Sequence, residues 1–282
     1  MRASVLTLVR DRVPHLAELV RALRRSRVEP LELLIAWMGG DDPHRALPPD
    51  LELPTRVIVV GGEEMPLARA RNDLARAARG ECLVFLDVDC LPGRDLIGAY
   101  AAALVEHDAI AVGRTLYLPP GAKGEEGELR RLAEPHPGRE RLFSDGVRVD
   151  RRHQLFWSLS FAVRRCCFLE RIGGFDEGYV GYGIEDTDFA LRAREQDVPL
   201  AWVREAAAFH QHHPPTRRRA DSVPALVRNA KRFQRIWGTW PAQGWLEELS
   251  ARGLIRWDER ENVLEPTSLV EAASSPSHSA AR

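Results

Sequence analysis

Four apolar residues followed by two spaced carboxylates are the feature that most constrains the fold of this 282-residue chain. The run at residues 83–86 (Leu-Val-Phe-Leu) suits a strand that is buried on both faces, as in a parallel sheet. Asp87 and Asp89 follow where such a strand ends. Because ligands in open α/β sheets bind beyond the carboxyl ends of the strands, both aspartates lie where a functional site is expected.

The Asp-x-Asp pair itself indicates a metal site. Side chains two residues apart point the same way along a strand, so the two carboxylates repel each other unless a cation lies close. Mg²⁺ and Mn²⁺ prefer hard oxygen ligands, and Mg²⁺ is commonly held by one or two carboxylates together with substrate phosphates. The alternative is a solvated acidic turn. The strand before the pair and the turn at Pro92 and Gly93 favour the metal.

Composition excludes several classes of partner. Apolar residues make up 44% of the chain, charged residues 29%, and the net charge is -1, so no overall field favours nucleic acid. No apolar run reaches the length of a membrane span, and no signal-peptide pattern is present. The four cysteines lack zinc-site spacing, which predicts reduced thiols in a cytoplasmic protein. The sequence does not indicate an oligomeric state.

Strand-like and helical segments alternate along the chain. Runs with strand character lie at residues 4–9, 31–37, 56–60, 83–86, 110–118, 156–163 and 199–209. Helical periodicity lies at residues 14–23, 66–78, 96–106 and 185–194. This alternation with short turns predicts an α/β fold with a mostly parallel central sheet flanked by helices. Residues 119–153 are turn-rich and charged, and we expect no regular element there but a binding loop or a disordered segment.

A second candidate site follows the Gly-rich segment at residues 173–183. Glu185 and Asp186 come directly after it, at the start of a predicted helix. Carboxylates at this position often stabilise the helix dipole, which is one explanation for them. The other is that Asp186 acts as a general base beside a tightly bent backbone.

Histidines and a basic helix complete the candidates. His210, His212 and His213 follow the last predicted strand, and they are either metal ligands or a polar strand exit. Basic residues recur from Arg217 to Arg235 on a predicted amphipathic helix, as a solvated face or an anion site. The four tryptophans of this region are expected to pack in a core, although one could stack on a sugar. They are Trp237, Trp240, Trp245 and Trp257.

Taken together, four motifs in this order resemble an inverting family 2 glycosyltransferase of the GT-A fold, with a galactosyltransferase-type C-terminal half. They are Leu67 to Asn72, Asp87 to Asp89, Gly173 to Glu177 and Gly181 to Asp188. The resemblance implies a GT-A domain over residues 1–213, divided into a nucleotide-sugar half (1–113) and an acceptor half (114–213). A helical extension at 214–264 and a disordered tail at 265–282 would follow.

The resemblance also implies roles for individual residues. Asp87 and Asp89 match the DXD motif that holds Mn²⁺ or Mg²⁺ against the donor diphosphate, and His210, the first histidine after the strand, matches the residue that completes the metal shell. Glu185 and Asp186 match the acidic pair at the acceptor, with Asp186 as the base. Donor contacts are implied for Leu8, Arg10, Arg12, Asp41, Asp42, Leu67, Arg71, Asn72, Asp87, Val88 and Gly183. The segment from Met38 to Asp42 departs from the usual Asp-Asp-Gly-Ser, so either aspartate could contact the base.

The implied function is metal-dependent transfer of a sugar, from a UDP-sugar most readily, to a carbohydrate or other hydroxyl acceptor. One base without an enzyme nucleophile predicts single displacement with inversion. The alternatives are a sugar-nucleotide hydrolase, a non-catalytic carbohydrate-binding scaffold and a sugar-1-phosphate nucleotidyltransferase. The last needs a Gly-rich loop with a lysine near the N-terminus, and this chain has no glycine before Gly39.

Overall fold

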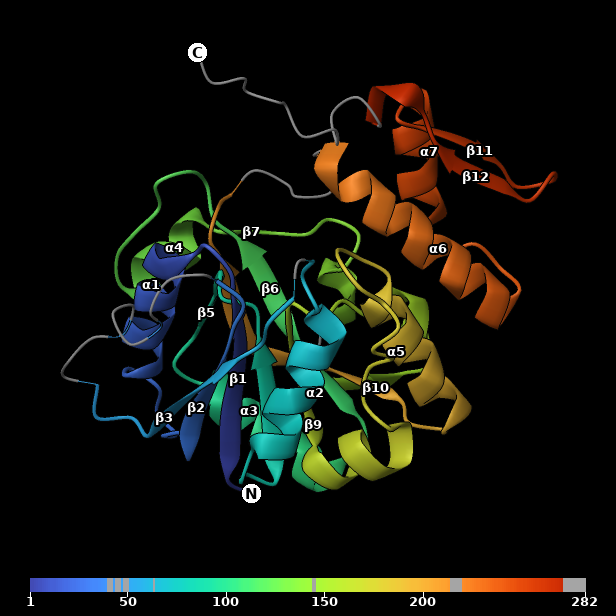
Figure 1. Ribbon diagram of the computed structural model, residues 1–282. Coiled ribbons are helices and arrows are strands. Elements are labelled where there is room, and N and C mark those ends of the chain that lie inside the picture. Colours follow the sequence, from blue (N-terminus) through green and yellow to red (C-terminus); the bar gives the residue numbers. More distant parts are fainter. Residues whose placement is uncertain are drawn as a thin grey trace, which may run out of the picture.

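A mixed β-sheet forms the centre of the computed structural model (Figure 1), which describes residues 1–39, 43, 47, 51–62, 64–143, 146–213 and 220–270. The strand order is β3-β2-β1-β4-β9-β6-β10-β5. These strands are β1 (Ala3–Val9), β2 (Glu32–Trp37), β3 (Thr55–Val59), β4 (Cys82–Leu86), β5 (Cys90–Pro92), β6 (Ile110–Tyr117), β9 (Ser160–Arg164) and β10 (Leu200–His210). Two short strands extend the sheet: β7 (Glu134–Pro135) beside β6, and β8 (Val147–Asp150) beside β10.

Strand direction follows the prediction in the first half of the chain. Strands β3, β2, β1 and β4 are parallel, and β6 is parallel to β10. Strand β9 lies between β4 and β6 and is antiparallel to both. The α/β prediction is therefore confirmed, while the reversal at β9 was not expected, because an apolar pattern carries no information about strand direction.

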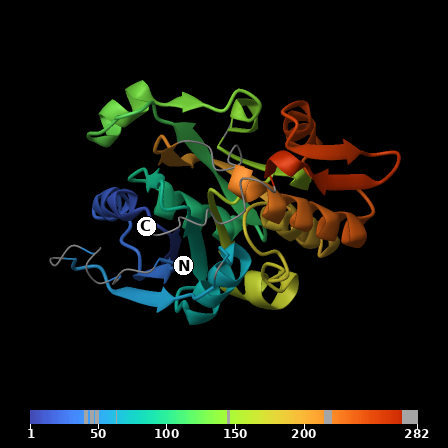
Figure 2. The same ribbon diagram turned by 45° about the horizontal axis from the view of Figure 1, so that its top comes forward.

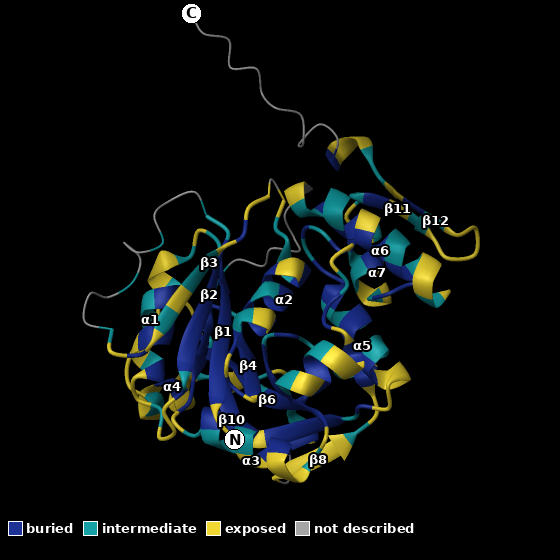
Figure 3. Cartoon of the chain, turned by 60° about the horizontal axis from the view of Figure 1, so that its bottom comes forward, coloured by how far each residue is buried: buried dark blue, intermediate teal, exposed yellow. Residues whose placement is uncertain are grey.

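The strand that leads into Asp87 is buried on both faces, as its sequence predicts. Cys82, Val84 and Leu86 face one core, whereas Leu83 and Phe85 face the other. All five residues of β4 are buried, and the neighbouring strand β1 is equally dark in Figure 3.

Helices cover both faces of the sheet. Helices α1 (Val13–Leu23) and α3 (Leu96–Glu106) pack on one face, where Leu16, Leu19 and Leu23 are buried. Helix α2 (Leu67–Ala77), the π-helix η4 (Cys167–Ile172) and helix α5 (Glu185–Glu195) pack on the other. Figure 2 shows the sheet between these two layers.

The expectation of no regular element at residues 119–153 is wrong. This segment contains α4 (Glu126–Leu132), β7, the 3₁₀-helix η2 (Glu140–Phe143) and β8, and the 3₁₀-helix η3 (His153–Leu155) begins at its end. A capping box between Glu125 and Glu128 starts α4. The two short strands form by pairing with distant strands, which local sequence does not reveal.

The C-terminal part of the chain forms a third core (Figure 1, orange and red). It comprises the 3₁₀-helix η6 (Ala220–Ser222), α6 (Val223–Trp237), α7 (Gln243–Ala251) and a hairpin of β11 (Ile255–Asp258) and β12 (Val263–Pro266). The amphipathic helix is confirmed as α6, whereas the hairpin was not predicted. The expectation of a disordered tail is wrong for residues 265–270, because β12 extends to Pro266 and Val270 is buried. Residues 271–282 lie outside the described part of the chain. No helix in the described ranges is both long and apolar enough to cross a membrane.

Candidate active site

A cavity of about 490 Å³ lies where the two acidic clusters meet. Asp87 and Asp89 line it from the end of β4, and Glu185 and Asp186 line it from the start of α5. The chain thus brings together two carboxylate pairs that lie about a hundred residues apart in sequence.

Sheet pairing explains why histidines lie beside Asp89. The chain turns after Asp89 into β5, which pairs antiparallel with the end of β10 and sets Cys90 opposite His210. The backbone N–H of Gln211 donates to the carbonyl of Asp89 at 2.7 Å. The histidine segment is therefore held against the strand-end aspartate by main-chain hydrogen bonds.

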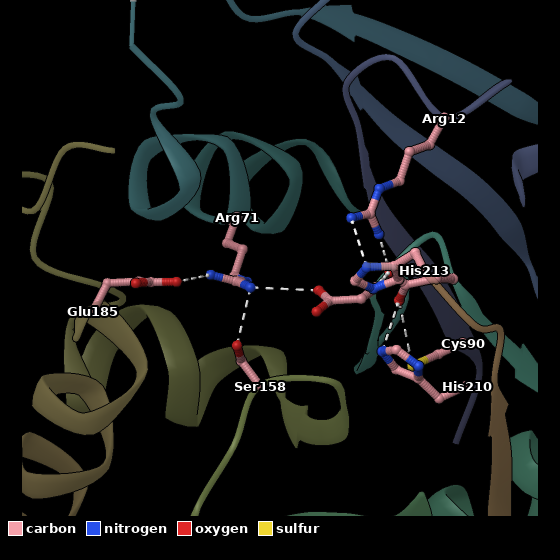
Figure 4. A network of polar contacts seen from close by, with 9 residues as sticks. Arg12, Arg71, Cys90, Ser158, Glu185, His210 and His213 are labelled. Atoms are coloured by element: carbon pink, nitrogen blue, oxygen red, sulfur yellow. Dashed lines mark hydrogen bonds and ion pairs between the residues drawn. The ribbon is translucent and has the colours of Figure 1, made fainter. Parts of the chain in front are cut away.

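Asp89, His210 and His213 form a potential metal site (Figure 4). Nε2 of His213 lies 3.0 Å from Oδ2 of Asp89, and Nε2 of His210 lies 3.7 Å from Oδ1. One ligand atom from each residue lies within 4.8 Å of the other two. The structure brings Asp89 and His210 together. Reasoning from the strand end preferred His210 to His213, whereas both histidines lie beside Asp89. His212 lines the cavity and is not part of this group.

The protonation states of these groups suit a divalent cation. Burial lowers the pKa of His210, so its ring is neutral at pH 7 and can donate a lone pair. Burial alone would raise the pKa of Asp89, but the hydrogen bond with His213 and the charge of Arg12 lower it to about 2. Two imidazoles and an ionised carboxylate are ligands that Mn²⁺ accepts. Arg12 donates a hydrogen bond to the same carboxylate, and its Nη2 lies 3.3 Å from Nδ1 of His213.

Arg71 connects the two acidic clusters. Its side chain is 3% exposed and donates to Oε1 of Glu185 and to Oγ of Ser158, each at 2.9 Å (Figure 4). Its Nη2 also lies 3.4 Å from Oδ1 of Asp87. Burial alone would lower the pKa of Arg71, but Asp87 and Glu185 raise it, so the guanidinium stays charged. Arg71, predicted from sequence as a donor contact, is thus a buried cation that contacts one carboxylate of each cluster.

Asp87 lines the cavity without belonging to the three-residue metal group. Burial and the charges of Asp89 and Glu185 raise its pKa to about 7, although the charge of Arg71 acts in the opposite direction. A carboxyl group in this state is easily ionised by an added positive charge.

A strained turn presents Glu185 and Asp186 to the cavity. Gly181 and Gly183 have φ of 84° and 89°, and the residue before the helix, Ile184, has φ of 79°. This left-handed conformation is unfavourable for a β-branched residue, and such strain is concentrated at functional sites. Burial and the charge of Glu185 raise the pKa of Asp186 to about 6, while its Oδ1 accepts a hydrogen bond from the N–H of Thr187 at 2.8 Å.

Asn72 supports the Gly-rich segment instead of lining the cavity. Its Oδ1 accepts from the N–H of Phe175, and its Nδ2 donates to the carbonyl of Phe175 and to Oε1 of Glu177, all at 2.9 Å. A Cβ on Gly174 would lie 2.6 Å from Oδ1 of Asn72, so this close approach requires glycine. The same segment is fixed by an ion pair of Asp176 with Arg232.

The remaining donor residues expected from sequence divide into three groups. Arg12, Leu67 and Gly183 line the cavity. Leu8, Arg10 and Val88 are not part of its wall. Asp41 and Asp42 lie outside the residues that the structure describes.

Aromatic side chains form much of the cavity wall and were largely missed. They are Tyr117, His136, Trp157, Tyr182 and Trp245. Only Trp245 had been considered as a sugar-stacking residue, and Ser158, the partner of Arg71, gave no signal in the sequence. Contact with the cavity depends on tertiary packing that residue type alone does not reveal.

Comparisons with known proteins identify the family and the fold. The family model for glycosyl transferase family 2 matches residues 4–172, and the model for the N-terminal domain of galactosyltransferase matches residues 141–214. Validoxylamine A glucosyltransferase of Streptomyces hygroscopicus subsp. jinggangensis (strain 5008) is 26% identical over 236 residues, which cover 76% of this chain and 55% of that protein. The uncharacterized glycosyltransferase YfnE of Bacillus subtilis (strain 168) is 23% identical over 242 residues, or 71% of this chain and 62% of that one. This chain therefore spans little more than half the length of the first relative.

Solved structures share the fold at low identity. GalNAc-T7 with UDP, GalNAc and Mn²⁺ has a TM-score of 0.63 and 16% identity, covering 93% of this chain and 53% of that one. Residues 1–349 of S. aureus TarS in complex with UDP-GlcNAc have a TM-score of 0.60 and 14% identity, covering 88% and 76%. Since the first family model matches more than half of the sequence, the chain belongs to glycosyl transferase family 2 and has its GT-A fold.

Proposed function

We propose that this chain transfers a sugar from a nucleoside-diphosphate sugar, with UDP as the favoured nucleotide, to an acceptor hydroxyl with inversion. One observation carries the proposal: a single cavity is lined both by Asp87 and Asp89 and by Glu185 and Asp186. Glycosyl transfer needs a site for the leaving diphosphate and a base for the acceptor within reach of one anomeric carbon. The family and the nucleotide-sugar complexes of structural neighbours support the same reaction class.

We assign the diphosphate of the donor to the part of the cavity that Asp89, His210 and His213 line. Asp89, His210 and His213 would hold Mn²⁺ or Mg²⁺, with Asp87 as a further carboxylate. The bound metal would neutralise the negative charge that develops on the leaving diphosphate. Arg12 adds a second positive charge on the same wall of the cavity.

The base is assigned to Asp186. Glu185 is committed to its ion pair with Arg71, which leaves Asp186 as the better proton acceptor. With a pKa of about 6, Asp186 is largely ionised at pH 7 and still able to take a proton from an attacking hydroxyl. This arrangement of one base and no covalent nucleophile gives single displacement.

Calorimetry of UDP and GDP binding, with and without Mn²⁺, tests the metal and the nucleotide. We expect UDP to bind more tightly with Mn²⁺, and Asp89→Ala to abolish the metal-dependent part. Asp95→Ala is the matched control, because Asp95 is a half-exposed aspartate paired with Arg27 on the protein surface. Metal-dependent UDP affinity that survives in Asp89→Ala would contradict the assignment.

Mass spectrometry of products separates the remaining activities. Incubation with UDP-sugars and an acceptor panel should give glycosylated acceptor and UDP. Free sugar with UDP in place of a glycoside would indicate a hydrolase. Sugar 1-phosphate with UTP, formed only when pyrophosphate is added, would indicate a nucleotidyltransferase. UDP binding without any product from the panel would favour a binding scaffold.

A further inference from the structure

Arg139 is a buried cation without an anionic partner in the described part of the chain. It lies just before η2 and is 7% exposed. Its guanidinium carbon lies 4.3 Å from the ring centre of Trp157 and 5.0 Å from that of Trp202. Nε and Nη2 are buried and donate no hydrogen bond to any described residue. Buried charges are normally paired, so this guanidinium is unusual.

The side chain remains positive in its buried position. Burial lowers the pKa of Arg139 to about 10, which leaves it protonated at pH 7. The rings of Trp157 and Trp202 both make cation–π contacts with the guanidinium. These contacts fix the orientation of the donors without satisfying them.

A small recess beside Arg139 shares part of its wall with the main cavity. The recess has a volume of about 10 Å³, enough for one oxygen atom, and Arg139 lines it. Tyr117 and His136 line both this recess and the main cavity, and Trp157 stacks on Arg139 from the main cavity wall. In the recess wall, the ring centre of Tyr117 lies 5.1 Å from that of His210, and the charge of Asp186 raises the pKa of Arg139. The recess therefore lies within reach of both ends of the cavity.

We infer that Arg139 recognises an anionic group, a carboxylate or a phosphate, on the sugar substrate that lies near Asp186. The inference rests on the proposed function and names the chemical class of its substrate. The wall of the main cavity carries four carboxylates, at Asp87, Asp89, Glu185 and Asp186, which repel an anion unless a cation lies close. Arginine is suited to this task because its fork of donors matches the oxygens of a carboxylate or phosphate.

Stability measurements distinguish this role from a packing role. A buried charge without a partner costs stability in the free protein, so replacing it by an apolar residue of similar length should be neutral or favourable. We expect Arg139→Met to have an unchanged or higher Tm. Arg114→Gln is the matched control, because Arg114 lines the same recess but is paired with Glu140. A lower Tm for Arg139→Met, with unchanged substrate preference, would assign Arg139 to packing and overturn the inference.

Binding measurements test the charge preference in two arms. The donor arm compares UDP-glucuronate with UDP-glucose in the presence of Mn²⁺. The acceptor arm compares methyl glucuronoside and glucose 6-phosphate with methyl glucoside, with and without UDP. We expect the charged sugar of one arm to bind about 10- to 100-fold more tightly than its neutral counterpart, as charged hydrogen bonds provide. Arg139→Met should remove this preference, Arg139→Lys should retain part of it, and Arg114→Gln should keep it.

The outcomes separate this inference from the proposed function. Wild-type protein that binds UDP but shows no charge preference in either arm would overturn the role of Arg139 and leave glycosyl transfer intact. A protein that binds neither UDP nor UDP-sugars would contradict the proposed function. In that case the acceptor arm without nucleotide would still measure the preference for a charged sugar. If Arg139→Met lowers the affinity for charged and neutral sugars equally, the inference would also be overturned, because such a loss indicates general damage to the cavity.

Discussion

At the scale of single residues, adjacent carboxylates in this cavity have different environments. Glu185 is 5% exposed and paired with Arg71, whereas the pKa of Asp186 is raised to about 6 by burial and by the charge of Glu185. Neighbours in the sequence are thereby divided into a carboxylate held in an ion pair and a carboxyl group with a raised pKa. Such a division is how an acid–base role is assigned within a pair of carboxylates.

Replacing Asp186 should affect turnover much more than donor binding. We expect Asp186→Asn to lower kcat by about 10²- to 10⁴-fold, the usual contribution of a general base, with UDP affinity unchanged. Asp197→Asn is the control, because this exposed aspartate has φ of 55°, which asparagine tolerates. A variant with a near-normal rate would exclude Asp186 as the base.

The pH dependence of turnover should follow the ionisation of Asp186. The base acts in its ionised form, so activity should be full above its pKa of about 6 and decline as the pH falls through that value. The rate of wild-type protein, measured at saturating substrate, should fall on the acidic side, and the residual rate of Asp186→Asn should lack this step. A wild-type rate that is constant from about pH 7 to about pH 5 would contradict the assignment.

At the scale of elements, the Gly-rich segment depends on a residue that the sequence suggested as a donor contact. The motif from Leu67 to Asn72 lies on one helix, α2, yet its residues point in different directions: Arg71 lines the cavity, and Asn72 binds the backbone of Phe175. A short motif identifies important positions but does not say which of them contact a ligand. Here Asn72 holds the loop that leads to Glu185 and Asp186.

Removing the Asn72 side chain should therefore destabilise the protein. Asn72→Ala leaves the N–H and C=O of Phe175 buried without their partner, which should lower the free energy of unfolding by about 2–4 kcal/mol. Urea unfolding of this variant can be compared with Asp73→Ala, a more exposed neighbour on the same helix. A change within about 0.5 kcal/mol, as expected for an ordinary surface substitution, would show that the loop does not depend on Asn72.

How far the sequence predicts the structure also depends on the element. The apolar run before Asp87 was enough to predict β4, its burial on both faces and an acidic site at its end. The choice between His210 and His213 could not be made, because it depends on how the chain continues after β10. The direction of β9 and the pairing of β7 and β8 were missed for the same reason, since partners distant in sequence determine them.

At the scale of the whole molecule, three regions of the chain share one cavity. The N-terminal strands supply Asp89, the segment before β9 supplies Trp157, and α7 of the C-terminal part supplies Trp245. The C-terminal part is attached to the Gly-rich segment and α5, because Asn229 donates to the carbonyl of Gly183 at 3.0 Å and Trp237 donates to Asp188 at 2.9 Å. The third core thus holds an aromatic residue in place at the far end of the site.

This arrangement predicts a separable effect of Trp245 on the acceptor. Its ring lies 6.4 Å from that of Tyr182 at an interplanar angle of 15°, and both line the cavity beside Asp186. We expect Trp245→Ala to raise the KM for acceptor by about 3- to 10-fold, the typical contribution of an aromatic contact, with UDP affinity unchanged. Trp257→Ala is the control, since Trp257 packs against the third core and does not line the cavity. A loss of UDP affinity with an unchanged acceptor KM would place Trp245 at the donor and contradict the orientation of substrates derived from Asp89 and Asp186.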